Sequence, residues 1–390
     1  MDFAEPENWS AIRAEAEAFV AEHVTDDMIR EELATGDGVS RPLLRALGQR
    51  GWIAATWPVA EGGAGLDGFE ASIIAATIRL AGGPTIGQGT TMLPANAIRA
   101  LASEPLKQRI LPSVAAGETL ICLGYTEPEG GSDVFACRTK AVADGDSWVI
   151  NGQKMFTTFA HLADFCFLLT RTDPESHGPR GLTMFLVPMD TPGIERQAVR
   201  TMGYERTNIV FYKDVRVSDF YRVGDVNDGL RVMRVALEAE QNIAPASKTT
   251  QLFNTALAWA QTPDRSGRRM IDSPAVRERL ARFAIDAEVA ELLGHRVAFI
   301  EQIGGKPGPH AALFGPESYV AWAAAVIDMV GPAAMIAWSD DEAVSGGSFE
   351  YHFRSAVAST IYGGSSEVLR SLIAEQRLGL PRSRPRTTQA

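Results

Sequence analysis

The sequence predicts an α+β protein in which a helical region is followed by a β region and then by a second helical region. In the first part, apolar residues recur every three or four positions, as on one face of an amphipathic helix. From about Leu120 they form short runs bounded by glycine and proline, which is typical of strands. The helical spacing returns after Asp228-Gly229. We therefore expect domains over residues 1–118, 119–226 and 227–381, with a tail over 382–390.

The composition is that of a globular protein large enough for two or three packed regions, with 390 residues, 45% hydrophobic and 22% charged. The net charge of -11 argues against a nucleic-acid partner, because such binding depends on clustered Lys and Arg. An acidic N-terminus and the lack of a long apolar run predict neither an export signal nor a membrane span. The cysteines lack C-x-x-C spacing, so we expect no metal site and no disulfide framework, and a cytoplasmic location.

Helical spacing first occurs from Trp9 to Val24, and similar segments continue to Leu111. A stretch rich in Gly, Trp and Pro, from Gly51 to Gly65, interrupts the pattern and indicates a connection. Residues 63–68 satisfy the G-x-G-x-x-G pattern of dinucleotide sites. No apolar strand precedes them and no acid lies about 20 residues beyond, so we expect no dinucleotide-binding fold there.

The β region begins with the apolar run from Leu120 to Leu123. Farther on, two runs flank Asn151-Gly152, a dipeptide that accepts positive φ angles, and this predicts a β-hairpin with a type I′ turn. Asp144-Gly145 indicates another turn just before it. Three more strands are expected over Phe165–Thr170, Leu182–Pro188 and Asn208–Tyr212.

The second helical region contains two candidate helix starts. Ser273-Pro274 combines a capping hydroxyl with proline at the first helical position, and Gly315-Pro316 is the second candidate. We expect residues 382–390 to form a frayed tail.

The most informative stretch is residues 125–134, which follow the first predicted strand. Thr126 and Ser132 can hydrogen-bond the heteroatoms of a flat, polar ligand through their hydroxyls. Gly130 and Gly131 let the backbone approach such a ligand closely. A plain polar turn is the alternative interpretation.

This stretch resembles the flavin-site signature of acyl-CoA dehydrogenases, which runs Thr-Glu-Pro, two variable residues, then Gly-Ser-Asp. The resemblance continues in Lys154 to Thr158, similar to the family's Lys-x-Trp-x-Thr segment with Phe156 in place of Trp, and in residues 360–381, similar to its C-terminal motif. It covers nearly the whole chain. It implies an N-terminal helical domain, a middle β-barrel-like domain and a C-terminal four-helix bundle, in a pattern similar to subunits of heterotetrameric steroid side-chain acyl-CoA dehydrogenases.

The resemblance implies a non-covalently bound FAD and α,β-dehydrogenation of an acyl-CoA thioester. In that reaction a carboxylate takes the α proton while the β hydrogen leaves as hydride to flavin N5, which gives a trans-2-enoyl product. The implied FAD contacts are Tyr125, Thr126, Gly131, Ser132, Phe156, Thr158, Ser365 and Glu367. The implied substrate contacts are Ser132, Gln241, Tyr362 and Gly363. For Phe156, a plain strand with a core aromatic ring is the alternative.

Family members carry the catalytic base at one of two positions. One lies in the C-terminal signature, where this chain has Gly363. The other lies in a Leu-x-x-Glu-Arg pattern on the first helix after the β region, where this chain has Glu240 followed by Gln241 in place of Arg. We therefore expect Glu240 to be the base. Glu238 lies about 200° away around a helix, and the alternative is that both are solvated helix acids.

Two segments that complete a neighbouring subunit's FAD site in homotetrameric members are altered here. Pro263 stands where the first has Arg, and Asp328–Pro332 stands where the second has Gln-x-x-Gly-Gly. This predicts an α2β2 heterotetramer with a homologous subunit, and a homotetramer in which Arg265 replaces the missing Arg is the alternative. We expect acyl-CoA as substrate and an electron-transferring flavoprotein as acceptor. A flavin-dependent oxidase and a non-catalytic supporting subunit are the other functions left open.

Overall fold

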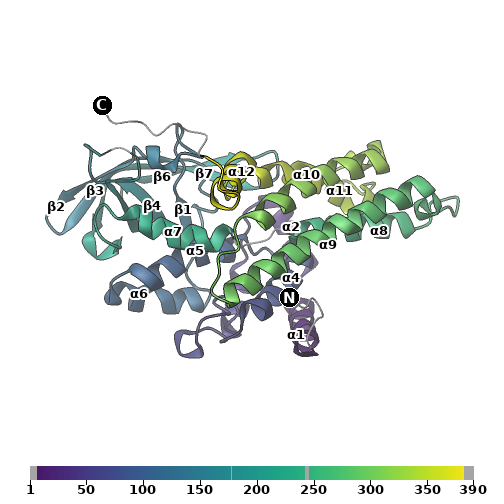
Figure 1. Cartoon of the computed structure of the whole chain (residues 1–390), viewed down its shortest axis with the longest axis horizontal. Coiled ribbons are helices and arrows are strands. Elements are labelled where there is room, and N and C mark those ends of the chain that lie inside the picture. Colours follow the sequence, from purple (N-terminus) through teal and green to yellow (C-terminus); the bar gives the residue numbers. More distant parts are fainter. Residues whose placement is uncertain (1–6, 177, 242–245, 382–390) are drawn as a thin grey trace. The chain divides into compact units, whose positions relative to one another are not determined.

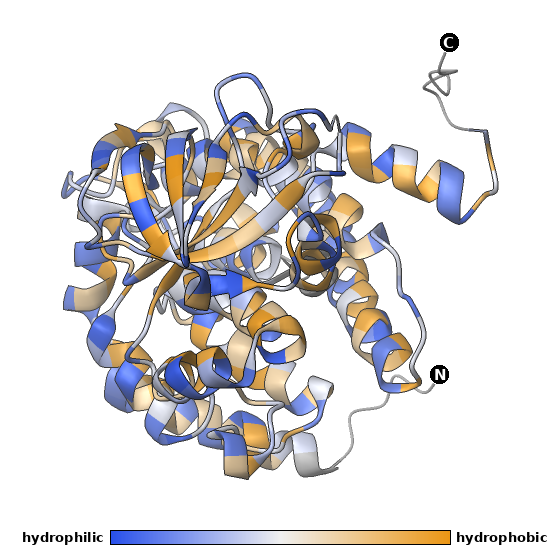
Figure 2. Cartoon of the chain, turned by 90° about the vertical axis from the view of Figure 1, so that its left-hand side faces the viewer, coloured by the Kyte–Doolittle hydropathy of each residue, from blue (hydrophilic) through white to orange (hydrophobic). Residues whose placement is uncertain are grey.

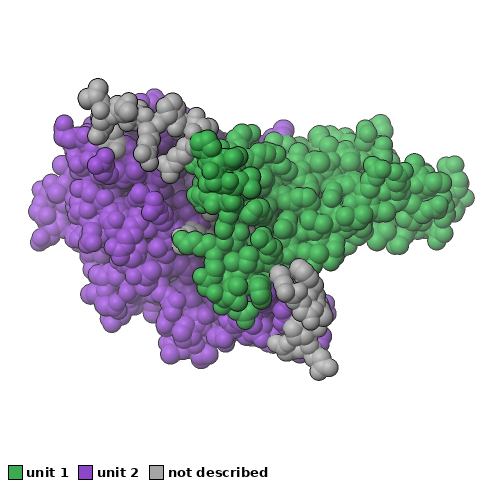
Figure 3. All heavy atoms as spheres, in the orientation of Figure 1, with its two compact units in different colours: residues 1–4, 241–390 green, residues 5–240 purple. Residues whose placement is uncertain are grey.

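The computed structural model describes residues 7–176, 178–241 and 246–381, and only the backbone of residues 7, 8, 238–241 and 246. The chain divides into two compact units. We call residues 5–240 the first unit, which is purple and labelled unit 2 in Figure 3, and residues 241–390 with 1–4 the second unit, which is green and labelled unit 1. Each unit has its own clusters of buried apolar side chains. The domain boundaries at residues 118, 226 and 381 stay a prediction.

The first unit begins with helices, as predicted. Several of their starts follow from local sequence: Thr25 caps one helix, Ser40 caps the next, and Asp67 forms a capping box with Glu70. These helices are α1 (Glu7–His23), α2 (Asp26–Thr35), α3 (Arg41–Gln49), α4 (Gly68–Leu80), α5 (Ile86–Leu101) and α6 (Glu104–Ala115). The G-x-G-x-x-G match at residues 63–68 lies in the connection before α4, with no strand ahead of it in the described chain.

The strands of the first unit form one mixed sheet in the order β6-β7-β3-β2-β4-β5-β8, with β1 beside β4. Figure 1 draws the strands as arrows. Neither β6 nor β8 pairs with a second strand among the described residues, so the pairing leaves the series open. The strands are β1 (Ile121–Gly124), β2 (Lys140–Asp144), β3 (Ser147–Lys154), β4 (Phe165–Arg171), β5 (Leu182–Pro188), β6 (Ile194–Arg200), β7 (Arg206–Ser218) and β8 (Arg222–Val223). Helix α7 (Gly229–Gln241) then begins at the predicted Gly229.

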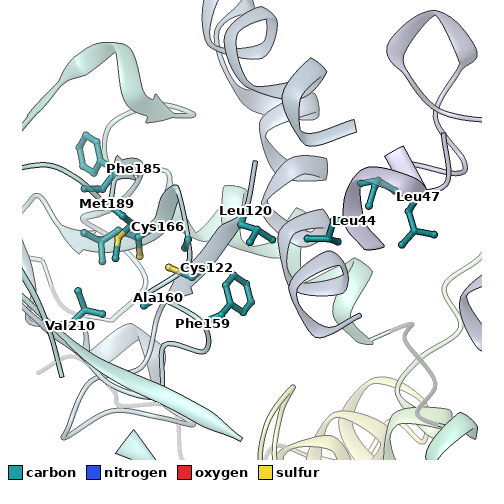
Figure 4. Close-up of a cluster of buried hydrophobic side chains, with 14 of the residues drawn as sticks. Leu44, Leu47, Leu120, Cys122, Phe159, Ala160, Cys166, Phe185, Met189 and Val210 are labelled. Carbon is teal, nitrogen blue, oxygen red and sulfur yellow. The ribbon is translucent and has the colours of Figure 1, made fainter. Parts of the chain in front are cut away.

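Two clusters of buried side chains fill the first unit. One joins α1 and α3 to the sheet, and Figure 4 shows Leu120 between Leu44 of α3 and Cys122 of β1. The other packs α5, α6 and α7 against strands of the same sheet through residues such as Phe167 and Met184. The helices carry both hydrophobic and hydrophilic residues in Figure 2, as amphipathic helices do. Cys122, like the other two cysteines, is a buried free thiol.

The predicted hairpin at Asn151-Gly152 is wrong. Residues 147–154 form the single strand β3, and the hairpin turn lies earlier, where Asp144 pairs with Ser147. Gly152 instead marks a β-bulge against β7. Its φ is +151°, and an added Cβ would lie 2.6 Å from the Thr139 hydroxyl, so glycine allows β3 to approach the residue before β2 closely.

The described part of the second unit consists of helices and the turns that join them. Helices α8, α9 and α11 each pack against α10, and α8 also contacts α9 and α11, which gives a bundle of four helices with α12 added against α10. The helices are α8 (Ala246–Gln261), α9 (Pro274–Gln302), α10 (His310–Val330), α11 (Ser348–Ala356) and α12 (Ser366–Gln376). The predicted tail, residues 382–390, lies outside the described residues.

Of the two predicted helix starts in this unit, one is confirmed and one is wrong. Helix α9 begins at Pro274 as predicted, although the Ser273 side chain makes no capping hydrogen bond. The start at Gly315-Pro316 is wrong, because α10 begins at His310 and carries Pro316 inside it. Both Gly315 and Pro316 are buried there, so packing outweighs the hydrogen bond that proline cannot donate.

A buried polar cluster links α10 to α11. The Tyr319 hydroxyl lies 2.7 Å from His352 Nδ1 and 3.1 Å from the Ser355 hydroxyl, and all three residues are buried. Burial, followed by the charge of Lys248, lowers the pKa of His352 to about 3, so the imidazole is neutral. The cluster is satisfied internally and fixes one helix against the other.

No helix in the described part of the chain is long and apolar enough to cross a membrane. The described residues also contain no group of three or more His, Cys, Asp or Glu side chains placed to hold a metal ion.

Candidate active site

The polar stretch predicted to bind a ligand forms a closed loop between β1 and β2. Glu127 and Gly130 exchange backbone hydrogen bonds of 3.0 and 3.1 Å, which folds the chain back at Pro128-Glu129. Gly131 and Ser132 are exposed, whereas Thr126 is half-buried. An added Cβ on Gly131 would lie 3.8 Å from Thr126 Cγ2, so the two halves of the motif are neighbours in space. The Thr126 side chain and the Gly131 backbone therefore lie close together in this loop.

The buried carboxylate of Glu127 joins the start of this loop to the residues before β2 and to Lys154. Glu127 Oε2 accepts a hydrogen bond of 2.7 Å from the Arg138 amide, and Glu127 Oε1 accepts one of 2.9 Å from the Thr139 amide. Glu127 Oε1 also accepts the Lys154 ammonium at 2.7 Å. Burial alone would raise the pKa of Glu127, but the Lys154 charge and these hydrogen bonds outweigh it and lower the pKa to about 2. Glu127 is therefore ionised at neutral pH.

Lys154 is the cation that balances this carboxylate, and it is 0% exposed. Its ammonium lies 3.2 Å from the Tyr125 carbonyl and 3.4 Å from Cys137 Sγ, in addition to its contact with Glu127. The three protons of the ammonium thus have three acceptors. Burial raises the pKa of the Cys137 thiol to about 11, so the thiol stays neutral beside the ion pair.

Arg171 of β4 holds the far end of the same loop. Its guanidinium donates to the Phe135 carbonyl at 2.8 Å and to the Cys137 carbonyl at 3.4 Å. The other donors reach carbonyls of the connection over residues 176–180. The loop is therefore fixed at both ends, and the exposed residues Gly131 and Ser132 lie between the fixed ends.

The segment after β3 lies directly against this loop. The Met155 amide donates to the Thr126 carbonyl at 2.8 Å, which joins the two family motifs. Phe156, the next residue, is 59% exposed and has a φ of +54°, so it is not the core aromatic of a plain strand. Thr158 is half-buried.

Three of the predicted contact residues have uncommitted hydroxyls. Within the described part of the chain, the hydroxyls of Thr126, Ser132 and Thr158 make no hydrogen bond. Tyr125 differs, because its ring packs 6.3 Å from the ring of Phe167. In this unit the structure thus brings together an exposed aromatic ring and polar groups available to a ligand.

The predicted residues of the C-terminal signature lie in the second unit. Ser365 caps α12 by accepting from the Val368 amide at 3.4 Å, and Glu367 lies in the first turn of that helix. Tyr362 is 50% exposed, and Gly363 has a φ of +70°, so the chain turns sharply just before the helix. The Glu367 carboxylate can accept hydrogen bonds but repels an anion, which suits a ribose hydroxyl or an amine better than a phosphate.

Glu240 and Gln241 form the end of α7, and their side chains lie outside the described residues. Helical periodicity still separates the two candidate acids by position. Glu240 lies four residues after the buried Ala236, whereas Glu238 lies four residues after the exposed Arg234.

The first of the two altered segments is an exposed turn of the second unit, and the second is the end of α10, where Met329, Val330 and Gly331 are half-buried. In the first, the Asp264 carboxylate accepts hydrogen bonds from the amides of Ser266 and Arg268 and so fixes the turn. Arg265 is exposed and makes no ion pair or hydrogen bond within the described residues. In the second, Gly331 ends α10 with a φ of +88°, and Pro332 begins the next turn.

A separate hollow of about 840 Å³ lies in the first unit between α5, α6 and the turn at residues 59–61. None of the predicted site residues lines it. Its charged residues pair with each other, Arg99 with Glu61 and Lys107 with Glu104. We therefore place the functional site at the polar loop and not at this hollow.

Comparison with known proteins decides the family. The sequence matches the acyl-CoA dehydrogenase N-terminal domain over residues 6–118, the middle domain over 122–215 and the C-terminal domain over 227–378. The chain belongs to the acyl-CoA dehydrogenase family. It is an oxidoreductase that dehydrogenates acyl-CoA, in a family that is generally flavin-dependent, and the predicted fold class is confirmed.

Individual relatives resemble this acyl-CoA dehydrogenase along its full length. It is 33% identical to acyl-CoA dehydrogenase FadE26 of Mycobacterium tuberculosis over 390 residues, covering 95% of this chain and 97% of the relative. It is 32% identical to a chain of the ChsE4-ChsE5 complex from the same organism, with a TM-score of 0.89 over 98% of this chain and 100% of that one. It is 31% identical to a chain of the Tcur3481-Tcur3483 steroid ACAD, with a TM-score of 0.90 and the same coverage.

Sequence reasoning missed the residues that hold this acyl-CoA dehydrogenase's polar loop in place. Glu127 and Lys154 stood inside the two recognised motifs, but their types alone suggested exposed charges. Their spacing in the chain gives no sign that they pair, because the contact forms only when β3 lies beneath the loop. Arg171 carried no signal beyond its place at the end of a predicted strand.

Proposed function

We propose that this enzyme binds FAD non-covalently and uses it to convert an acyl-CoA thioester to the trans-2-enoyl-CoA. The observation that carries the proposal is the set of uncommitted hydroxyls on Thr126, Ser132 and Thr158, in two segments that a backbone hydrogen bond joins and that also carry the exposed ring of Phe156. Hydroxyls and exposed backbone amides suit the polar edge of an isoalloxazine, and an aromatic ring suits its face. Gly131 leaves room for close backbone approach, and the Tyr125 carbonyl and ring support the loop from below.

The residues present fit that cofactor. The flavin, when bound, supplies the acceptor for the hydride that leaves the substrate β carbon. The polar loop binds and orients it, with Ser132 also available to the substrate. The family resemblance assigns cofactor contacts to Ser365 and Glu367 as well, and substrate contacts to Tyr362 and Gly363.

The first test is cofactor binding by the full chain. We expect the purified protein to be yellow, or to become yellow on incubation with FAD, and to lose the colour on denaturation. A well-folded preparation that stays colourless after incubation with FAD contradicts the proposal.

We assign the α-proton abstraction to Glu240. In family members the Leu-x-x-Glu pattern on the first helix after the β region carries the base, and Glu240 stands at that position in this chain. The alternative position in the C-terminal signature holds Gly363, which has no side chain to act. Gln241 replaces the usual neighbouring Arg, so this chain has one positive charge fewer next to the proposed base.

The proposed substrates are acyl-CoA thioesters with a steroid side chain, and the proposed assembly is an α2β2 heterotetramer. Two structural relatives support both points, because one is a two-protein complex and the other a two-protein steroid ACAD. The altered segments at Pro263 and at Asp328–Pro332 support a partner that supplies what this chain lacks. An electron-transferring flavoprotein is the proposed acceptor.

Expression of the chain alone and together with the product of its neighbouring gene tests the assembly. We expect full flavin occupancy and turnover only in the co-expressed complex. Full occupancy and turnover of a lone homotetramer would rule the heterotetramer out and leave the alternative, in which Arg265 replaces the missing Arg.

A further inference from the structure

The polar loop is held by a buried ion pair whose every hydrogen-bonding group is used. Lys154 has three acceptors, namely Glu127 Oε1 at 2.7 Å, the Tyr125 carbonyl at 3.2 Å and Cys137 Sγ at 3.4 Å. Glu127 in turn accepts from two backbone amides of residues 138–139. Such full satisfaction is what a buried polar network needs to define a single geometry.

All of these contacts converge on one residue of the candidate cofactor site. The Tyr125 carbonyl, just before Thr126, accepts from Lys154. The Thr126 carbonyl accepts from the Met155 amide at 2.8 Å. Glu127, just after Thr126, carries the carboxylate that pairs with Lys154. The backbone on both sides of Thr126 is therefore tied to the end of β3. The same tie places Thr126 beside Phe156, since Met155 directly precedes it.

Stability alone does not account for this arrangement. A fully buried ion pair must offset the desolvation of both charges, and replacing both by apolar or neutral groups is often neutral for stability. Lys154 is 0% exposed and Glu127 is 8% exposed. An exposed pair of opposite charges, Arg138 with Glu129, spans the same loop and provides a natural comparison.

We propose that Glu127 and Lys154 are positioning residues that fix Thr126 and Phe156 in the arrangement that the flavin ring requires. This inference rests on the proposed FAD function. The residues do not touch the reacting atoms, and they act through the loop backbone. Their role is to order the binding groups before the cofactor arrives, so that binding does not have to order the loop.

The test compares the full-length apoprotein with the double variant Glu127→Gln/Lys154→Met, which removes both charges together. We expect its melting temperature to stay near the wild-type value, because no unpaired charge is left buried. We expect FAD to bind about tenfold more weakly, equivalent to the loss of roughly one well-placed hydrogen bond. We also expect the visible circular dichroism of the bound flavin to change, which a purely structural role would not cause.

The matched control is Glu129→Gln/Arg138→Met, which removes the exposed pair from the same loop. We expect its FAD dissociation constant to stay within about twofold of the wild-type value, because exposed pairs contribute little. Equal FAD affinity and unchanged flavin dichroism in the buried-pair variant would overturn the positioning role while leaving the FAD proposal intact. A wild-type protein that binds no FAD would overturn both.

Hydrogen exchange of the wild-type apoprotein keeps the inference testable if the double variant does not fold. We expect the amides of Arg138, Thr139 and Met155 to be protected without FAD, because their acceptors are already in place. We expect the amides of Gly131 and Ser132 to exchange fast, as exposed groups do. Rapid exchange of the Arg138, Thr139 and Met155 amides as well would mean that the loop is not preformed, which contradicts the inference.

Discussion

Acid should loosen the polar loop because it removes the charge of Glu127. The pKa of this carboxyl is about 2 in the folded protein, against 4.5 for an ordinary Glu. The unfolded chain therefore binds the proton more readily, so the stabilisation from Glu127 is complete above about pH 5 and is lost as the pH falls towards 2. Compared with a protonated Glu127 in the same site, the ionised carboxylate stabilises the fold by about 3 kcal/mol at neutral pH, and about 2 kcal/mol of this is lost by pH 3.

The opening free energy of the amides of Arg138 and Thr139 reports this loss, since both donate to Glu127. Hydrogen exchange followed by mass spectrometry gives this quantity at pH 6 and pH 3, after correction for the intrinsic exchange rate. Asp173 and Asp219 in the same unit also have a lowered pKa, so acid has effects beyond Glu127. Subtracting the result for Glu127→Gln/Lys154→Met isolates the contribution of Glu127.

We expect the wild-type protein to lose about 2 kcal/mol more than the double variant between pH 6 and pH 3. An equal loss in the two proteins would refute the reasoning, because the carboxylate would then gain nothing from its buried partners. A larger loss in the variant would refute it as well.

Three further predictions concern single residues. Between pH 7 and pH 5, the wild-type bundle should lose about 2 kcal/mol of stability, because His352 has a pKa of about 3 and binds no proton there, whereas an unfolded His does. His352→Asn should remove this pH dependence, which urea unfolding at the two pH values measures. Gly152→Ala should destabilise the first unit by about 2 kcal/mol or more, because its Cβ would lie 2.6 Å from the Thr139 hydroxyl at a φ of +151°, and an unchanged melting temperature would contradict this. Phe156→Ala should leave the melting temperature within a few degrees, since the ring is 59% exposed, but weaken FAD binding, and unchanged affinity would rule out its place against the ring system.

The sequence predicted element types well where periodicity was long, and poorly where one residue had a tertiary role. The alternation from helix to strand and back follows the apolar spacing, so β4, β5 and α7 lie where they were expected. Asn151-Gly152 has the local chemistry of a turn, but its partner strand β7 accommodates it as a bulge, and no local pattern reveals that partner. Pro316 was likewise interpreted as a helix start because the packing that tolerates it inside α10 is not local.

The candidate site shows the same division. Thr126, Ser132 and Phe156 were found because they stand in motifs, and their exposure or uncommitted hydroxyls agree with a binding role. The groups that fix them, Lys154 and Arg171, were not found, because a long charged side chain is normally exposed and only the folded loop shows it buried or fully bonded. The motifs thus indicated the residues proposed to contact the ligand, and not the buried residues that hold them in position.

Anaerobic mixing of the FAD-loaded enzyme with steroid-side-chain acyl-CoA thioesters tests the central claim most directly. We predict that the visible flavin absorbance bleaches in the wild-type protein, because the substrate transfers hydride to the flavin once its α proton has an acceptor. We predict that Glu240→Gln keeps its flavin and binds substrate but bleaches about 100-fold more slowly or worse. Bleaching of the variant at the wild-type rate would contradict the assignment of the base. A wild-type flavin that no acyl-CoA in a panel of short, branched, aromatic and steroid-side-chain thioesters can bleach would contradict the proposed reaction itself.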